Sequence, residues 1–246
     1  MTQCLWKPSV PASKHLFFGA RFTEQPLGIN GLPVFLEEVC FLLLSPEAAA
    51  TKGLFRIPGD VCAIQTLRAW VENGLSLESC TTSLSDEDQV HVLGGVLKKY
   101  LNELPEPLIP TGIYQYLVDL WNEHNGISKV TILQAIRGHY DLHRGEDVDD
   151  VQWKGLLFLF EFLHRFSKYS DITKMDAKNL SIVFGPNIFR APSEISPMVE
   201  AQQMHTANKI VEILIAECDR SGCTRAPYDF HFDTLKTIDF DDEILL

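Results

Sequence analysis

The sequence predicts an all-α protein, a single domain built as a helical bundle. Apolar residues recur at three- and four-residue steps along most of the chain, and alternating β-branched segments, which are typical of strands, are nearly absent. With 246 residues, of which 46% are hydrophobic, the chain is long enough to bury one large core.

The N-terminal part is expected to hold two helices joined by a loop. Residues 1–16 contain two prolines and scattered serines, and they predict a loose leader. Helical periodicity over 32–44 predicts a first helix that ends at Pro46, because proline is poorly tolerated inside a helix. The same periodicity resumes at Val61, so residues 53–59 are expected to connect two helices.

A long helix is predicted in the middle of the chain, and further helices follow it. Ser85 with Asp88 resembles a capping box at its start, and Pro105 and Pro107 are expected to stop it after Leu104. Helical patterns then cover residues 112–124, 129–138, 151–168, 176–184 and 197–217.

The C-terminal residues 221–246 differ from the rest of the chain, because acidic residues alternate there with aromatic and aliphatic ones. A disordered acidic tail is the favoured interpretation. The alternative is a tail that docks on the domain or on a further partner, since its hydrophobic residues are frequent.

Composition and charge exclude several classes of protein. The formal net charge of −12 argues against nucleic-acid binding, and no Lys/Arg-rich stretch offsets it. The six cysteines have no spacing typical of a zinc or redox site, and those in apolar runs are expected to act as small hydrophobic residues. No signal peptide and no apolar run long enough for a transmembrane segment is found, so a reducing, cytoplasmic location is expected.

The most informative segment is Gly53-Leu54-Phe55-Arg56-Ile57-Pro58-Gly59. Pro58 fixes its own φ, and a glycine at either end permits a sharp turn. Leu54 and Phe55 can be buried as an anchor, which leaves Arg56 as the only charge in the segment. A planar guanidinium suits a phosphate or a developing phosphoryl charge. An ordinary surface arginine is the alternative interpretation.

The helix predicted to end at Leu104 carries a second informative pattern. One of its faces holds, at three- and four-residue steps, His91, Gly95, Lys98 and Asn102. Gly94 and Gly95 in mid-helix cost about 1 kcal/mol each relative to Ala, which suggests close packing or the close approach of another backbone. For Lys98, simple solvation beside Lys99 is the alternative.

A third pattern covers residues 174–187. Asp176 is a good N-cap, and Gly185-Pro186 is expected to end the helix after about two turns. Asn179 comes directly before the apolar run, where its amide could face a cleft or a neighbouring helix end.

Together these three segments resemble the RhoGAP domain, the GTPase-activating module for Rho-family small GTPases. The matching motifs are Gly53 to Gly59, Leu97-Lys98-Lys99-Tyr100-Leu101-Asn102-Glu103-Leu104-Pro105-Glu106-Pro107-Leu108, and Lys174-Met175 with Asn179 to Asn187. They occur in the family's order, and the resemblance covers residues 17–220. It implies a bundle of about nine helices and no cofactor of its own.

The resemblance also implies a mechanism and a partner. Arg56 matches the arginine finger, which enters the nucleotide site of a GTP-bound Rho-family GTPase and neutralises charge on the transferred phosphoryl group. The partner supplies the phosphate cradle, the magnesium ion and the glutamine that orients water. The chain itself would be an activator rather than an independent enzyme, and it has no phosphate-binding Gly-x-x-x-x-Gly-Lys-Ser/Thr loop.

The resemblance further implies four positions that contact the GTPase. Lys98 matches the lysine that supports the finger loop, Asn179 matches the asparagine beside the finger, and Asn208 resembles a further contact position. Asn102 is a departure, because the family usually has arginine there. The loss of that charge is expected to weaken an ionic contact or to change which GTPase is preferred, without affecting the finger.

Other functions receive less support from the sequence. A module that keeps this fold but only binds GTPases, as an adaptor or scaffold, is the main alternative to an activator, and an unrelated helical adaptor is a weaker one. His139 and His143 are four residues apart and could form half of a metal site, but no acidic-histidine motif accompanies them, so no metal site is expected.

Overall fold

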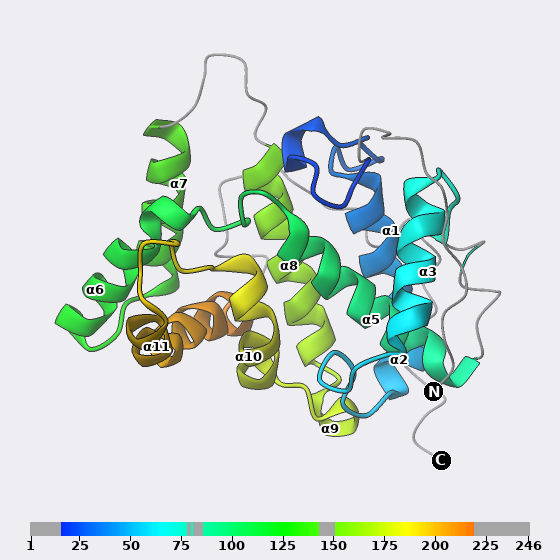
Figure 1. The fold of residues 1–246 in the computed structure, drawn as a ribbon. Helices are drawn as coiled ribbons and strands as arrows, with labels where there is room; N and C mark the ends of the chain where they lie inside the picture. Colours follow the sequence, from blue (N-terminus) through cyan, green and yellow to red (C-terminus); the bar gives the residue numbers. More distant parts are fainter. Residues whose placement is uncertain (1–15, 78–79, 81–85, 143–150, 219–246) are drawn as a thin grey trace.

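The computed structural model describes residues 16–77, 80, 86–142 and 151–218 of the chain (Figure 1). Within these ranges the secondary structure is helical and contains no β-strand, so the predicted all-α class is confirmed. The ten α-helices of the described residues are α1 (Val34–Leu42), α2 (Pro46–Ala50), α3 (Val61–Glu72), α5 (Asp86–Glu103), α6 (Tyr114–His124), α7 (Lys129–Leu142), α8 (Val151–Ser167), α9 (Ser170–Thr173), α10 (Ala177–Ile188) and α11 (Pro197–Ala216). Two 3-10 turns, Phe22–Glu24 and Thr111–Ile113, complete the list.

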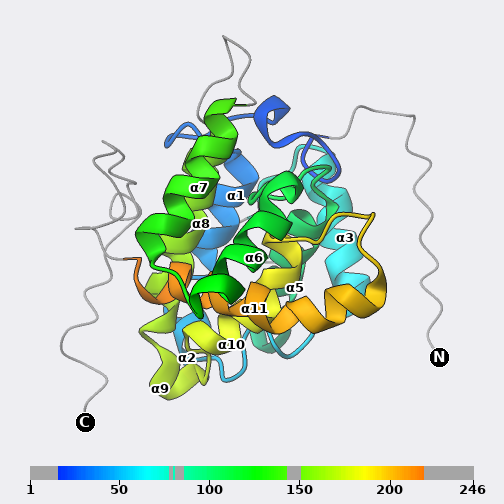
Figure 2. The ribbon, with the colours of Figure 1, turned by 90° about the vertical axis from the view of Figure 1, so that its left-hand side faces the viewer.

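Helix α8 supplies much of the core. Its buried residues cover most of the helix surface, and only a narrow stripe with Lys154, Glu161 and Arg165 is half-buried. Helices α10 and α11 both pack against α8, and α11 also contacts α6 and α7 (Figure 2). Helix α5 lies between α3 and α10, and this arrangement sets the geometry of the candidate site.

The predicted effect of Pro46 is wrong in detail. Helix α1 ends at Leu42, and Pro46 is the first residue of a short helix that was not predicted. Ser45 is its N-cap, since the Oγ atom of Ser45 accepts a hydrogen bond from the Ala48 amide at 3.3 Å. Proline is well suited to the first helical position, because the amide hydrogen that it lacks would have no partner inside the helix.

The predicted end of a helix at Gly185-Pro186 is also wrong. Helix α10 continues through Pro186 to Ile188, and the Phe189 amide donates to the Gly185 carbonyl at 2.9 Å. A proline in the last turn removes only one of the hydrogen bonds of the ladder, and the rest of the helix is unaffected. The predicted N-cap is confirmed, because Asp176 accepts a hydrogen bond from the Asn179 amide at 2.8 Å.

The cysteines follow the prediction only in part. Cys40 and Cys80 are buried free thiols and Cys218 is also buried, in keeping with a role as small hydrophobic residues. Cys62, near the start of α3, is disulfide-bonded, which the spacing of the cysteines did not predict.

Some predictions fall outside the described residues. They are the capping box at Ser85, the tail over 221–246 and, apart from its last residue, the leader over 1–16. In the part of the chain that is described, no helix is both long enough and apolar enough to cross a membrane.

Candidate functional site

The loop of residues 53–59, here called the finger loop, connects α2 to α3 and is held by backbone hydrogen bonds. The Gly53 amide donates to the Thr173 carbonyl at 2.7 Å, which ties the loop to the end of α9. The amides of Arg56 and Ile57 both donate to the Gly53 carbonyl, at 3.0 and 2.9 Å. Gly53 has a φ of 75°, in the left-handed region that glycine adopts without strain.

Phe55 anchors the finger loop in the core. Its ring is only 1% exposed and meets the rings of Phe162, Phe166 and Phe184 edge to face, with centroids 6.3, 4.9 and 5.0 Å away. The φ of Phe55 is 71°, which costs about 1–2 kcal/mol for a residue with a side chain. Aromatic pairs of this geometry contribute about 0.5–1.5 kcal/mol each beyond their buried area, so the packing offsets the strain.

Two glycines of α5 and the loop allow this close packing. A Cβ atom added to Gly94 would lie 3.1 Å from Cδ1 of Phe55, and one added to Gly59 would lie 2.7 Å from the carbonyl carbon and oxygen of His91. The predicted close approach at the mid-helix glycines is therefore confirmed. It brings the finger loop directly against α5.

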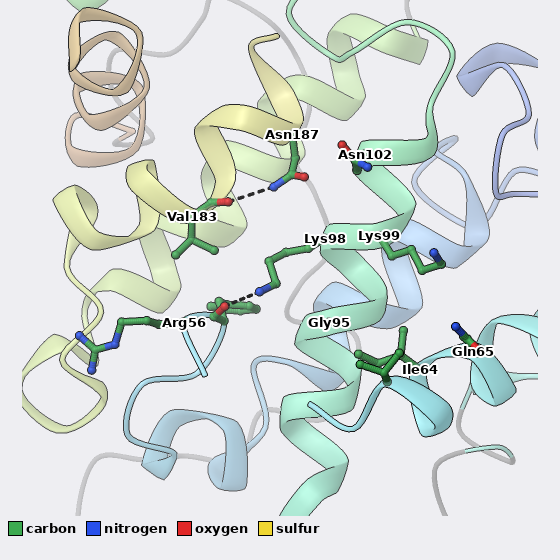
Figure 3. A pocket seen from close by; sticks show the side chains of 11 residues that line it. Arg56, Ile64, Gln65, Gly95, Lys98, Lys99, Asn102, Val183 and Asn187 are labelled. Atoms are coloured by element: carbon green, nitrogen blue, oxygen red, sulfur yellow. Dashed lines mark hydrogen bonds between the residues drawn. The ribbon is translucent and has the colours of Figure 1, made fainter. Parts of the chain in front are cut away.

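Arg56 is exposed to solvent, although the residue before it is fully buried. Within the described residues its guanidinium makes no ion pair and no side-chain hydrogen bond. Figure 3 shows the side chain pointing away from α5, past the lower end of α10. The loop thus fixes the backbone of Arg56 and leaves its five N–H groups available to a partner.

Lys98 reaches the finger loop from α5. Its Nζ atom donates a hydrogen bond to the Phe55 carbonyl at 2.5 Å (Figure 3). Burial lowers the pKa of the Lys98 ammonium below the usual value of lysine, because water is partly excluded from the charge. Simple solvation beside Lys99 therefore does not describe Lys98, which supports the loop at the residue next to Arg56.

A groove lies between α3 and α10, with α5 along its floor, and we call it the α3–α10 groove (Figure 3). Its volume is about 590 Å³. From the finger loop and α3 it is lined by Phe55, Arg56, Val61, Ile64 and Gln65. From α5 and α10 it is lined by Gly95, Lys98, Lys99, Asn102, Val183 and Asn187.

The groove brings together three of the five predicted site residues, Arg56, Lys98 and Asn102. The Asn102 side chain is exposed at the rim, while its carbonyl accepts a hydrogen bond from Arg190 at 3.2 Å. His91, which was predicted to share this face of α5, does not line the groove.

Asn179 and Asn208 lie outside the lining of the groove. The Nδ2 atom of the Asn179 side chain donates to the Lys174 carbonyl at 3.0 Å, next to the Thr173 carbonyl that holds the finger loop. Asn208, on α11, packs against α10, where its Oδ1 atom lies 2.6 Å from the position that a Cβ atom of Gly185 would occupy.

The sequence did not predict that residues of α3, or residues in the second half of α10, line the groove. Val61, Ile64 and Gln65 were assigned only to a helix, and Asn187 was placed after the end of one. Asn187 donates a hydrogen bond to the Val183 carbonyl at 2.9 Å, one helical turn earlier. The close packing signalled by Gly95 was the available clue, because a Cβ atom there would lie 2.4 Å from Cδ1 of Ile64.

No metal site emerges among the described residues, where no three or more His, Cys, Asp or Glu side chains gather as ligands would. The ring of His139 packs over Gly112, with Cε1 2.9 Å from the position of an added Cβ atom. His143 lies outside the described residues.

Several known proteins are similar to the chain. The chain is 29% identical over 208 residues to the GTPase-activating protein pac-1 of Caenorhabditis elegans, a match that covers 80% of this chain and 12% of that protein. It is 29% identical to human Rho GTPase-activating protein 17 over 80% of this chain and 21% of that protein. The chain thus spans a minor part of the length of these relatives.

Solved structures show the same fold. Human Rho GTPase activating protein 15 superposes with a TM-score of 0.64 at 24% identity, over 83% of this chain and 90% of that one. The BH domain of GRAF, the GTPase regulator associated with focal adhesion kinase, gives a TM-score of 0.55 at 20% identity, over 75% and 93% of the two chains.

The family model of the RhoGAP domain matches residues 33–193, which include the finger loop, α5 and α10. The match covers more than half of the chain. It confirms the resemblance carried by the three sequence motifs, and the chain belongs to the RhoGAP domain family.

Proposed function

We propose that the chain stimulates GTP hydrolysis by a GTP-bound Rho-family small GTPase, and that Arg56 acts in trans as an arginine finger. One observation carries the proposal. Arg56 is exposed and without an ion pair among the described residues, while the buried ring of Phe55 and the ammonium of Lys98 fix the loop beside it. Membership in the RhoGAP domain family supports the choice of partner.

The chemistry of the partner explains why such an arginine would accelerate the reaction. Charge spreads over the equatorial oxygens of the γ-phosphoryl group in the transition state, and a guanidinium that reaches them stabilises that charge. A finger supplied in trans is worth about 10³–10⁵ in rate, which corresponds to roughly 4–7 kcal/mol of barrier. GTP, Mg²⁺ and the water-orienting glutamine belong to the GTPase, so the chain acts as an activator that contributes one group and needs no cofactor of its own.

The remaining predicted residues receive separate roles in this proposal. Lys98 is a positioning residue, since it bonds to the backbone of the residue before Arg56. Asn102 contacts the GTPase from the groove rim. Asn179 contacts it beside the finger, and Asn208 does so from α11.

A catalytically weak module that only binds the GTPase remains the alternative, and no feature of the described residues favours it. A cytoplasmic location stays a prediction. The disulfide bond of Cys62 is the observation against a reducing compartment, because disulfides are rare there.

Single-turnover hydrolysis tests the proposal. A Rho-family GTPase loaded with GTP is mixed with saturating wild-type protein or with Arg56→Ala, and phosphate release is followed. We expect acceleration by the wild type and a loss of about 10²-fold or more in Arg56→Ala. Arg137→Ala, on α7, is the control and should accelerate like the wild type.

Two outcomes would count against the proposal in different ways. Undiminished acceleration by Arg56→Ala would remove the finger assignment. Binding without acceleration by the wild type would favour the adaptor instead.

A further inference from the structure

Cys62 forms a disulfide bond at the edge of the candidate site. It is exposed in the first turn of α3, directly after Val61 at the mouth of the groove. Exposed disulfides are more easily reduced than buried ones, and labile or regulatory bonds are of this kind. The bond fixes another part of the chain beside the site.

Two cysteines are candidates for the partner of Cys62. Three of the other five are thiols buried in the described part of the chain, namely Cys40, Cys80 and Cys218. The candidates are therefore Cys4 and Cys223, which lie outside the described residues.

The leader joins the described chain at the far end of α3, within reach of Cys62. The carboxylate of Glu72, the last residue of α3, accepts hydrogen bonds of 2.9, 3.1 and 2.7 Å from the amides of residues 16–18. Cys62 lies ten residues earlier in the helix, or about 15 Å along its axis. Twelve residues lead from Cys4 to Leu16, and an extended chain of this length covers roughly 40 Å. The leader is long enough to bring Cys4 back to Cys62.

Cys223 lies too far from α3 to be the partner. It follows Cys218 by five residues, which cover at most about 18 Å. The Glu217 carbonyl accepts a hydrogen bond from Lys129 at the start of α7, on the side of the bundle opposite α3 (Figures 1 and 2). Helices α10 and α5 lie between α11 and α3, and packed helices are about 8–10 Å apart. Three such steps exceed the reach of five residues.

The rest of the molecule favours a bond that forms and breaks. Cys40 and Cys80 are free thiols in the core, so the packing around them does not depend on disulfides. A chain of this length buries enough apolar surface without them. In reducing compartments disulfides are rare, and those that form are mostly transient or redox-sensing. A reversible bond reconciles the disulfide of Cys62 with the predicted cytoplasmic location.

We propose that Cys62 is a redox modification site, which forms a reversible disulfide with Cys4 and fastens the leader beside the finger loop. The bond holds the two Cα atoms within about 7 Å, so Leu5 and Trp6, which follow Cys4, come next to Val61. A GTPase that approaches the finger loop meets them in the oxidised form. Oxidation weakens binding of the GTPase, and reduction restores it. The inference rests on the proposed function, because it names the regulation of the same site.

The chemistry of this switch is thiol–disulfide exchange. One protein thiolate attacks a small-molecule disulfide such as oxidised glutathione and releases one glutathione thiol. The second protein thiolate attacks the mixed disulfide and releases the other. The two protein thiols lose two electrons and two protons, and the glutathione disulfide takes up both to become two thiols. A dithiol such as dithiothreitol reverses the reaction and closes into its own disulfide.

Peptide mapping tests the partner of Cys62. The full chain is oxidised with glutathione disulfide, its remaining thiols are blocked, and it is digested with trypsin without reductant for mass spectrometry. We expect residues 57–68, which hold Cys62, to be joined to residues 1–14, which hold Cys4. A link to residues 221–225, which hold Cys223, or the absence of any link, would overturn the assignment.

Binding to a Rho-family GTPase loaded with a non-hydrolysable GTP analogue tests the control of access. The chain is first reduced with dithiothreitol or oxidised with glutathione disulfide, and the reagent is removed so that the thiols of the GTPase are not altered. We expect the oxidised wild type to bind about 5-fold or more weakly than the reduced one, as if about a fifth of the molecules were accessible.

Three serine variants assign this effect. Cys62→Ser and Cys4→Ser should bind like the reduced wild type, within about 2-fold, after either treatment. Cys223→Ser is the matched control and should respond to oxidation like the wild type.

The possible failures are distinguishable. Equal binding by the two forms of the wild type would overturn the control of access. The same loss on oxidation in Cys62→Ser would refute the role of Cys62. A reduced wild type that binds the GTPase without accelerating hydrolysis would refute the proposed function and leave the redox result standing.

Discussion

The finger loop and the α3–α10 groove beside it present their cations in opposite ways. Arg56 sits in solvent on an irregular loop, in which Gly53 and Phe55 both have positive φ. Lys98 is partly buried on a regular helix, with its ammonium bonded to the loop. An anchored loop can project a side chain into a partner, whereas helices build a fixed surface. We therefore expect changes in the loop, and in the Lys98 bond that supports it, to act on the maximal rate, and changes elsewhere in the groove to act on affinity.

Phe55→Ala should have the largest effect on stability, because it removes the anchor on which the finger loop depends. A buried ring among three other rings is worth about 3–5 kcal/mol when truncated to alanine. Urea unfolding measures the change, and Tyr116→Ala, which truncates a ring that is 56% exposed, is the control with little expected change. A loss below about 1 kcal/mol for Phe55→Ala would mean that the loop is not held by this packing.

Lys98→Met should separate activity from stability. The substitution removes the hydrogen bond to the Phe55 carbonyl, so we expect the maximal rate of stimulated hydrolysis to fall about 10-fold, or 1.4 kcal/mol. The stability should stay within about 1 kcal/mol, because the loss of the bond and the relief of a desolvated charge oppose each other.

The control for Lys98→Met is Lys209→Met, which removes a cation from an ion pair with Glu212 on α11. We expect it to leave the maximal rate unchanged. An unchanged maximal rate in Lys98→Met as well would show that the finger loop does not need this support.

Two glycine substitutions should give the smallest effects, and only one of them should stabilise the protein. Gly138→Ala in α7 meets no heavy atom within 4 Å and should stabilise the protein by about 1 kcal/mol through helix propensity. Gly95→Ala places a Cβ atom 2.4 Å from Cδ1 of Ile64, so Ile64 must move and the gain is lost. Thermal unfolding of both variants checks this, and equal stabilisation would show that the floor of the groove is loosely packed.

Much of the fold could be predicted from periodicity alone, and the errors have a common cause. Pro46 and Pro186 were both interpreted as helix ends, yet one begins a helix and the other lies in the last turn of one. A proline indicates that a helix boundary is near. Whether the helix lies before or after the proline is decided by capping and packing. The short helices α2 and α9 are held by tertiary contacts. With only five and four residues, they are too short to show a helical periodicity in the sequence.

The sequence motifs predicted the candidate site only where glycines report a constraint on the backbone. The mid-helix glycines of α5 pointed correctly to close packing there, whereas the loop glycines predicted only a sharp turn. The positive φ of Phe55 had no signal in the sequence, because it is stabilised by rings more than 100 positions away. The side of the groove formed by Val61, Ile64 and Gln65 depends on how α3 packs on α5. The spacing of apolar residues within α3 does not predict that packing.

The most direct test of the finger is a comparison of two complexes of the same GTPase. One holds a non-hydrolysable GTP analogue, and the other holds GDP with aluminium fluoride, which imitates the phosphoryl group in transfer. We predict that the wild type binds the second complex more tightly than the first and that Arg56→Ala loses this preference while still binding the first, because the finger acts in the transition state. An Arg56→Ala variant that kept the full preference would contradict the account.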